Sequence, residues 1–271
     1  MATGASMSNS EKMMLARDLV QTRLLGAIFA KTLKDGLALK GGLAMRILAK
    51  SERYTKDIDL AADPRILTPE RIKARVSSAL RQLKNEGYID VVPALPQKDT
   101  ETTIRYKIAG NILETAYDLT VEISRRDELN AEYLQKVECI DEHGFGFVAD
   151  CFDLNSLAAS KIHCLASPKR EAPRDIYDLA VLISMDVRPP RDLISAINVD
   201  SLRYLKENLW DKIEKMDYAM ATEKLLDFLP KNIGMKFSEE EWTELRLRVG
   251  YKVENWVQDV LELPSRTEMK I

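Results

Sequence analysis

The chain has 271 residues, of which 45% are hydrophobic and 31% charged, so it can bury a sizeable core and is not a mostly disordered chain. Its 40 Lys and Arg residues against 43 Asp and Glu give a net charge of -3, which excludes nucleic-acid binding through bulk positive charge but leaves room for a local basic patch. The three cysteines and two histidines lack the spacing of a structural zinc site, and this cysteine usage indicates a reducing, cytoplasmic environment.

The amino-terminal residues 1–12 are predicted to form a flexible tail, because the first ten are small and polar and lack the basic and apolar regions of a signal peptide. Apolar residues then recur at helical spacing, which predicts a helix from about Ser10 to Lys34 that stops at the following Asp-Gly pair. No stretch approaches the roughly 20 consecutive apolar residues of a membrane span, so no membrane association is expected.

A short apolar run, LALK at 37–40, ends at Gly41 and Gly42 and is followed at once by a helical pattern at 43–51. This order predicts a strand, a glycine turn and the amino terminus of a helix. Backbone N–H groups exposed at such a turn suit a phosphate, and glycine lets the phosphate come close. Paired glycines before helices are common, so a purely structural turn is an equal alternative.

Residues 57–63, DIDLAAD, alternate as in a half-buried strand, with Asp57 and Asp59 on one face and Ile58 and Leu60 on the other. Two neighbouring carboxylates repel each other, and a divalent cation between them is the best explanation for the pair. The alternative is a strand face that is simply solvated.

A helix is predicted over residues 69–87, and β-branched residues then predict short strands at 88–92, 102–109, 117–124 and, with a weaker pattern, 135–141. Glu122 lies in the middle of one of these strands, where an acidic side chain is disfavoured unless it has a partner or a function. If its strand pairs beside that of Asp57, Glu122 completes an acidic triad. The alternative is an edge strand that faces water.

From residue 155 onward the pattern is helical, with predicted helices at 155–166, 173–184, 192–197, 201–216, 221–229 and 238–262. A boundary near residue 150 therefore separates a mixed lobe, 13–150, from an all-helical lobe, 151–271. The predicted fold class is α+β, with a mixed sheet in the first lobe.

The order of these features is more informative than any one of them. A Gly-Gly turn, then Asp57-x-Asp59, then a strand carboxylate resemble the nucleotidyltransferase fold of the DNA polymerase β superfamily. In that fold the glycine turn and helix N-terminus hold the nucleotide phosphates, and the carboxylates hold Mg²⁺ ions that neutralise phosphate charge and activate a hydroxyl. The generic turn of the superfamily is Gly-Ser, so here the turn lacks a hydroxyl.

Five segments narrow the resemblance, because KGGLAMRI, RYTKDIDL, LTVEIS, LAASKIHCL and RDIYDL occur in this order. Over roughly residues 25–185 the chain resembles the AbiEii/AbiGii family of nucleotidyltransferase-like toxins of abortive-infection and toxin–antitoxin systems. The resemblance implies two lobes with the active site between them. By motif match, it assigns the triphosphate to Gly41 and Gly42, and catalytic roles to Asp57, Asp59, Lys161 and Asp175. It further implies that Asp57 and Asp59, and more loosely Glu122, hold one or two Mg²⁺ ions.

Four further residues have more than one interpretation. Arg46 follows the glycine turn and either contacts nucleotide phosphate or lies on a solvated helix face, and Thr55 either lies at the nucleotide or is a local turn residue or phosphoacceptor. Arg174 either binds phosphate or pairs with Asp178 at helical spacing. Asp178 is either a partner of the catalytic residues or a helix-surface charge.

The resemblance implies an enzyme that moves a nucleotide from an NTP to an acceptor hydroxyl, most of all on tRNA, and that has a cognate antitoxin. Local basic runs that suit RNA are Arg125-Arg126 and Lys169-Arg170, the latter close to Arg174. We expect a cytoplasmic monomer. The alternatives are NMPylation of a protein or small molecule, and a non-catalytic module that binds a nucleotide or a partner.

Overall fold

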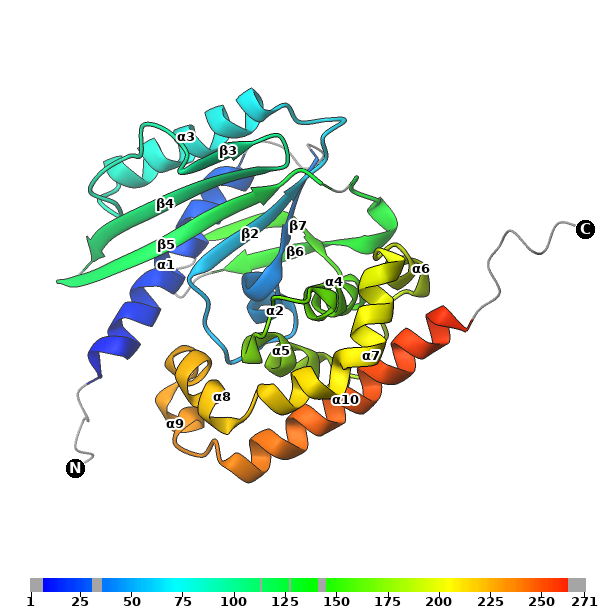
Figure 1. Cartoon of the computed structure of the whole chain (residues 1–271). Coiled ribbons are helices and arrows are strands. Elements are labelled where there is room, and N and C mark those ends of the chain that lie inside the picture. Colours follow the sequence, from blue (N-terminus) through cyan, green and yellow to red (C-terminus); the bar gives the residue numbers. More distant parts are fainter. Residues whose placement is uncertain (1–6, 31–35, 113, 127, 141–144, 263–271) are drawn as a thin grey trace, which may run out of the picture. The chain divides into compact units, whose positions relative to one another are not determined.

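The structure, a computed structural model, describes residues 7–30, 36–112, 114–126, 128–140 and 145–262 (Figure 1). The chain divides into two compact units, Met1–Asp153 and Leu154–Ile271. The first contains a seven-stranded mixed sheet with helices, and the second is helical. The predicted α+β class is therefore confirmed. Among the described residues, no helix is both long and apolar enough to cross a lipid bilayer.

The sheet has the order β3-β4-β5-β2-β1-β7-β6, and it is mixed because β2 is antiparallel to β1 but parallel to β5, while β1 is parallel to β7. Its strands are β1 (Leu37–Lys40), β2 (Asp57–Ala62), β3 (Lys98–Thr100), β4 (Thr103–Ile112), β5 (Thr115–Ser124), β6 (Leu134–Ile140) and β7 (Gly146–Phe152).

Side-chain alternation gives the central strands one apolar and one polar face. Ile58 and Leu60 of β2, and Val121 and Ile123 of β5, are completely buried. Helices α1 (Asn9–Phe29) and α3 (Pro69–Asn85) pack against each other, and α1 also contacts β5 and β7. Asp57 and Asp59 of β2, and Thr120 and Glu122 of β5, alternate with these residues and point to the opposite face, so the candidate site residues share that face.

Helix α1 begins at Asn9, inside the segment predicted as a tail. Ser8 and Glu11 form a capping box: Glu11 N–H donates to Ser8 Oγ (3.2 Å), and Ser8 N–H donates to Glu11 Oε2 (2.8 Å). Residues 9–12 are helical for this reason, whereas residues 1–6 of the predicted tail lie outside the described residues. The helix ends at Phe29, and its predicted end falls among residues 31–35, which also lie outside them.

The strand predicted at residues 88–92 is wrong, because this segment is an irregular connection. Tyr88 N–H donates to Leu83 O (2.9 Å) and so closes helix α3. Val91 is exposed, and Pro93 has no N–H to donate to a neighbouring strand. Conversely, β7 is a strand inside the sheet that the sequence patterns did not single out.

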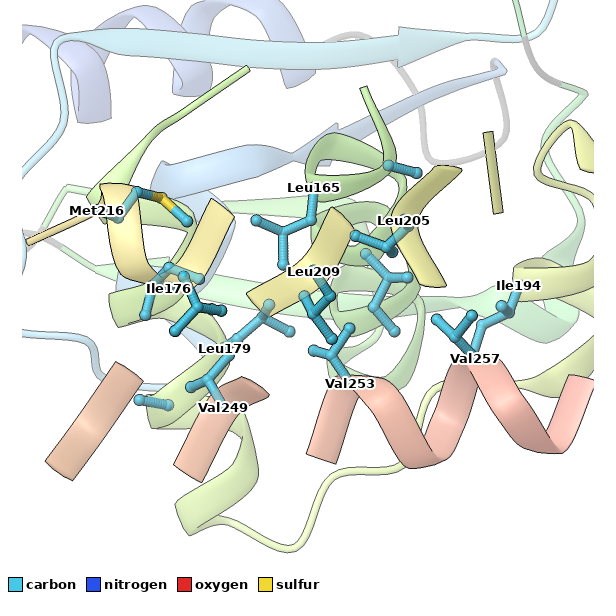
Figure 2. Close-up of a cluster of buried hydrophobic side chains, with 14 of the residues drawn as sticks. Leu165, Ile176, Leu179, Ile194, Leu205, Leu209, Met216, Val249, Val253 and Val257 are labelled. Atoms are coloured by element: carbon cyan, nitrogen blue, oxygen red, sulfur yellow. The ribbon is translucent and has the colours of Figure 1, made fainter. Parts of the chain in front are cut away.

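The second unit has a hydrophobic core of its own. Figure 2 shows side chains from several helices converging, among them Leu165, Leu179, Ile194, Leu209 and Val253. The helices of this unit are α4 (Leu154–Ala166), α5 (Pro173–Ser184), α6 (Arg191–Ser195), α7 (Val199–Lys215), α8 (Tyr218–Lys224), α9 (Lys231–Gly234) and α10 (Glu239–Leu261). The long α10 contacts α5, α6, α7 and α8, and so holds the unit together.

Truncation of Leu209, which is 2% exposed, is expected to lower the free energy of unfolding of the second unit by about 2–5 kcal/mol, because Leu209→Ala leaves a cavity in this core. Leu247→Ala is the matched control, since Leu247 is 40% exposed, and it should cost less than about 1 kcal/mol. All three tryptophans lie in the second unit, so urea unfolding followed by tryptophan fluorescence reports on it. Equal losses in the two variants would contradict the packing described.

Candidate active site

The two aspartates of β2 lie on the polar face of the sheet. Asp57 and Asp59 are half-buried, whereas Ile58 between them is completely buried on the other face. Asp57 N–H donates to Thr55 Oγ1 (3.2 Å), and Gln21 Nε2 donates to Thr55 O (3.0 Å). Thr55 is buried, so its contacts fix the start of the strand that presents both carboxylates.

The glycine turn between β1 and α2 (Gly41–Leu48) lies directly against Asp59. Lys40, the last residue of β1, is the register partner of Asp59. Gly41 has φ +71°, and a Cβ added to it would lie 2.8 Å from both Cβ and Cγ of Asp59. Only glycine combines this conformation with so close an approach. The turn and the carboxylate are therefore neighbours within one unit.

The second glycine of the turn lies against the chain that leads into β2. A Cβ on Gly42 would be 2.8 Å from Arg53 Nη2 and 3.2 Å from Thr55 Oγ1. Arg53 is buried, and its Nη1 donates to Tyr54 O (3.0 Å). The sequence motif RYTKDIDL contains Arg53, but the pattern alone assigned it no role.

Glu122 lies beside Asp59, as its strand pairing requires. Strand β5 runs parallel to β2, with Asp59 opposite Glu122 and Asp57 opposite Thr120. On its other side Glu122 is opposite Arg105 of β4, whose Nε donates to Glu122 Oε2 (2.7 Å) and whose Nη2 is ion-paired with the same oxygen. The carboxylate is thus adjacent to the aspartates and at the same time engaged by a guanidinium.

Arg46 is held within the first unit by other groups. Its Nε is 3.1 Å from Asp18 Oδ1, and its Nη2 donates to Asp18 Oδ2 (3.2 Å). Its guanidinium carbon also lies 4.1 Å from the centroid of the Tyr54 ring. These contacts account for the residue structurally, and its assignment to the nucleotide stays a prediction.

The aspartates of β2 and the adjacent glycine turn fit a Mg²⁺ ion that is shared between the protein and a substrate. Within the residues that the structure describes, no group of three or more His, Cys, Asp or Glu side chains is placed to hold a metal ion. Mg²⁺ is usually bound through one or two carboxylates, with substrate phosphates and water as the remaining ligands. Asp57 and Asp59 meet this requirement, and the glycine turn beside Asp59 offers N–H groups to the phosphates.

The other candidate residues lie in the second unit, where Lys161 of α4 is buried between two carboxylates of α5. Its Nζ is 3.0 Å from Asp175 Oδ1 and 2.6 Å from Asp178 Oδ2. The half-exposed Arg170, in the loop between the helices, donates from Nε to Asp175 Oδ2 (2.6 Å). Two cations and two carboxylates therefore form a group without net charge, which is what burial requires.

The charge state of this group is set by its cations. Burial by itself would raise the pKa of Asp175, but the charge of Lys161 and the hydrogen bond from Arg170 outweigh it and lower the pKa from 3.8 to about 2. Asp178 is completely buried, so it is a partner of Lys161 and not a helix-surface charge.

Two other basic residues near this group have contacts that the sequence did not predict. The guanidinium carbon of Arg174 lies 5.0 Å from the centroid of the Phe228 ring. Lys212 of α7 is buried and donates to Ser167 O (2.6 Å), just beyond the end of α4, and its burial lowers its pKa. A lysine at this position interacts favourably with the carboxyl end of the helix. The assignment of Arg174 to phosphate stays a prediction.

Comparison with known proteins gives a family and a fold. The model of the family described as nucleotidyl transferase AbiEii toxin, type IV toxin–antitoxin system, matches residues 23–262. The crystal structure of JHP933 from Helicobacter pylori has a TM-score of 0.56 at 19% identity, and covers 94% of this chain and 96% of that one. A second H. pylori crystal structure, described as a candidate nucleotidyltransferase, has a TM-score of 0.48 at 18% identity, covering 95% and 97%. No curated protein sequence matches the chain.

Substitution of Gly41 by Ala is expected to destabilise the first unit more than the same change at Gly87. Both glycines have positive φ, +71° and +78°, so alanine strains both backbones by about 1–2 kcal/mol. Only the Cβ at position 41 would also overlap Asp59, because nothing lies within 4 Å of a Cβ at position 87. Urea unfolding followed by circular dichroism compares the two, and equal losses would show that the turn does not press on Asp59.

Acid is expected to destabilise the second unit through Asp175. Its folded pKa of about 2 is below its unfolded value, so its contribution of about 2 kcal/mol is complete above about pH 4 and is lost as the pH falls toward 2. Asp175→Asn should be less stable at pH 7 and should lose less stability between pH 4 and pH 2. The exposed Asp227→Asn serves as control, monitored by tryptophan fluorescence, and a wild-type pH dependence in Asp175→Asn would refute the assignment.

Proposed function

The chain belongs to the AbiEii nucleotidyl transferase toxin family of type IV toxin–antitoxin systems, and we propose that it transfers a nucleotide from an NTP to a hydroxyl of tRNA with Mg²⁺ held by Asp57 and Asp59. The observation that carries the proposal is the packing of the Gly41 backbone against the Asp59 side chain. This contact brings N–H groups that suit phosphates next to a carboxylate that suits a metal ion, within one unit.

In this proposal the candidate residues of the first unit bind and orient the nucleotide. The N–H groups at the glycine turn donate to phosphate oxygens, and Asp57 and Asp59 ligate the metal. Thr55 keeps the aspartates in place through its bond to Asp57 N–H. Bound Mg²⁺ would neutralise charge on the phosphates. Phosphoryl transfer depends mainly on such positioning and electrostatic stabilisation, so these roles would contribute directly to catalysis.

We assign Lys161 and Asp175 to the same reaction on the basis of the family motifs. Lys161 is ion-paired with two carboxylates, so its charge is already balanced within the second unit. Arg170 has a half-exposed side chain while still bonded to Asp175. In this proposal Arg170 is the cation that meets phosphate oxygens, and Lys161 keeps the Asp175 carboxylate, and with it Arg170, in position.

The acceptor is proposed to be tRNA because the candidate residues are flanked by basic side chains. Lys169 and Arg170 are exposed beside the Lys161 group, and Arg126 is exposed just after β5. Arg125 next to it donates to Glu101 O (2.7 Å). Such local positive charge suits a polyanion even though the whole chain carries a charge of -3. A cognate antitoxin would complete the system, with the toxin acting as a monomer.

Incubation of the protein with labelled NTPs, Mg²⁺ and total tRNA is expected to label tRNA. Asp59→Asn should lower the transfer at least about 100-fold, because it removes the charge that balances the metal ion. Asp99→Asn is the matched control in the same unit, since Asp99 forms an exposed ion pair with Lys73 (2.9 Å), and it should retain wild-type transfer.

Other outcomes of this assay separate the alternatives. Mass spectrometry of labelled lysate would identify label on a protein or a small molecule. That result would show NMPylation of this target instead of transfer to tRNA. Binding of NTPs without turnover would indicate a non-catalytic module. Absence of transfer to any acceptor with every NTP would overturn the proposed function.

A further inference from the structure

A row of charged residues crosses four neighbouring strands on the polar face of the sheet. Arg105 of β4 is opposite Glu122 of β5, Glu122 is opposite Asp59 of β2, and Asp59 is opposite Lys40 of β1. Figure 1 shows β4, β5 and β2 side by side in this order. The row therefore reads cation, anion, anion, cation, with the two carboxylates in the middle.

The two central carboxylates oppose each other. Adjacent strands are about 4.8 Å apart, and like charges directly opposite each other destabilise a sheet. A divalent cation could relieve this repulsion by using both carboxylates, which is how an acidic triad with Asp57 would work. Here Arg105 relieves it from the other side, because its Nε donates to Glu122 Oε2 at 2.7 Å and its Nη2 binds the same oxygen.

We propose that Arg105 is a positioning residue that withholds Glu122 from the metal ion, so that the protein offers Mg²⁺ only the carboxylates of Asp57 and Asp59. This inference rests on the Mg²⁺ site of the proposed function and assigns a role to a residue outside its motifs. With two protein carboxylates, the ion obtains its other ligands from water and from the phosphates of the nucleotide. The protein without nucleotide then holds the ion weakly, and metal and nucleotide bind together.

The charges in this row also favour joint binding of the metal ion and the nucleotide. Asp57, Asp59 and Glu122 together bring three negative charges to this face, and negative charge there repels a nucleotide triphosphate. Arg105 neutralises the carboxylate that is not needed, and it does so at a half-exposed position, where the side chains of Arg105 and Glu122 are 35% and 33% exposed. A pair of this kind costs little desolvation. It leaves enough negative charge for the metal without an excess that would exclude the substrate.

Binding of Mn²⁺ alone, measured by electron paramagnetic resonance of the free ion in the absence of nucleotide, tests this role without any activity assay. Arg105→Met should tighten Mn²⁺ binding about tenfold or more, because Glu122 becomes available as a third carboxylate. Arg105→Lys should remain within about twofold of wild type, because it keeps a cation opposite Glu122. The double variant Arg105→Met/Glu122→Gln should return to the wild-type affinity.

Lys107→Met is the matched control, because Lys107 lies two residues further on the same face of β4 and is opposite Thr120. It removes a positive charge without releasing Glu122, so it should change Mn²⁺ affinity less than about twofold. Unchanged or weaker binding in Arg105→Met would overturn the inference, and weaker binding would show that Arg105 orients Glu122 as a metal ligand. If Asp59→Asn binds Mn²⁺ as well as wild type, it is the metal assignment of the proposed function that fails.

Discussion

Strand β2 is paired on both sides, and the register of this pairing determines what surrounds Asp59. On one side the antiparallel partner β1 ends at Lys40, so the glycine turn that follows it lies on the Asp59 carboxylate. On the other side the parallel partner β5 places Glu122 opposite the same residue. A slip of one residue would turn Asp57 and Asp59 into the apolar layer and Ile58 out of it. Burial of Ile58 and Leu60 therefore fixes the site as firmly as any polar contact does.

The two units balance their charged residues in different ways. In the second unit Lys161 is enclosed by two buried aspartates, and removal of one member would leave an uncompensated charge at a cost of about 3–5 kcal/mol. The Arg105–Glu122 pair of the first unit is half-exposed, and such a pair is worth at most about 1 kcal/mol to stability. Opening the buried group of the second unit would therefore cost far more than separating the half-exposed Arg105–Glu122 pair.

The sequence predicted those parts of the fold and site that depend on local pattern. The alternation in DIDLAAD placed both aspartates on one face, and the helical patterns of the second unit gave its class. Strand pairing could not be predicted from local pattern, because register depends on residues far apart in the chain. For this reason β7 was not predicted, although Phe147, Ala149 and Cys151 alternate as buried residues. For the same reason the pairing of Arg105 with Glu122 was not predicted. Arg170 was read as part of a basic patch because only packing shows that it reaches Asp175.

The net charge of -3 and a polyanionic substrate are compatible once the charges are placed. Acidic residues that face a phosphate must either bind a metal ion or be neutralised, since an unpaired carboxylate there would repel the substrate. In the described structure Glu122, Asp175 and Asp178 are each ion-paired with a lysine or arginine. Asp57 and Asp59 are the two that the family motifs assign to the metal. A total charge does not show which carboxylates are paired, so the net charge of -3 by itself neither favours nor excludes a polyanionic substrate.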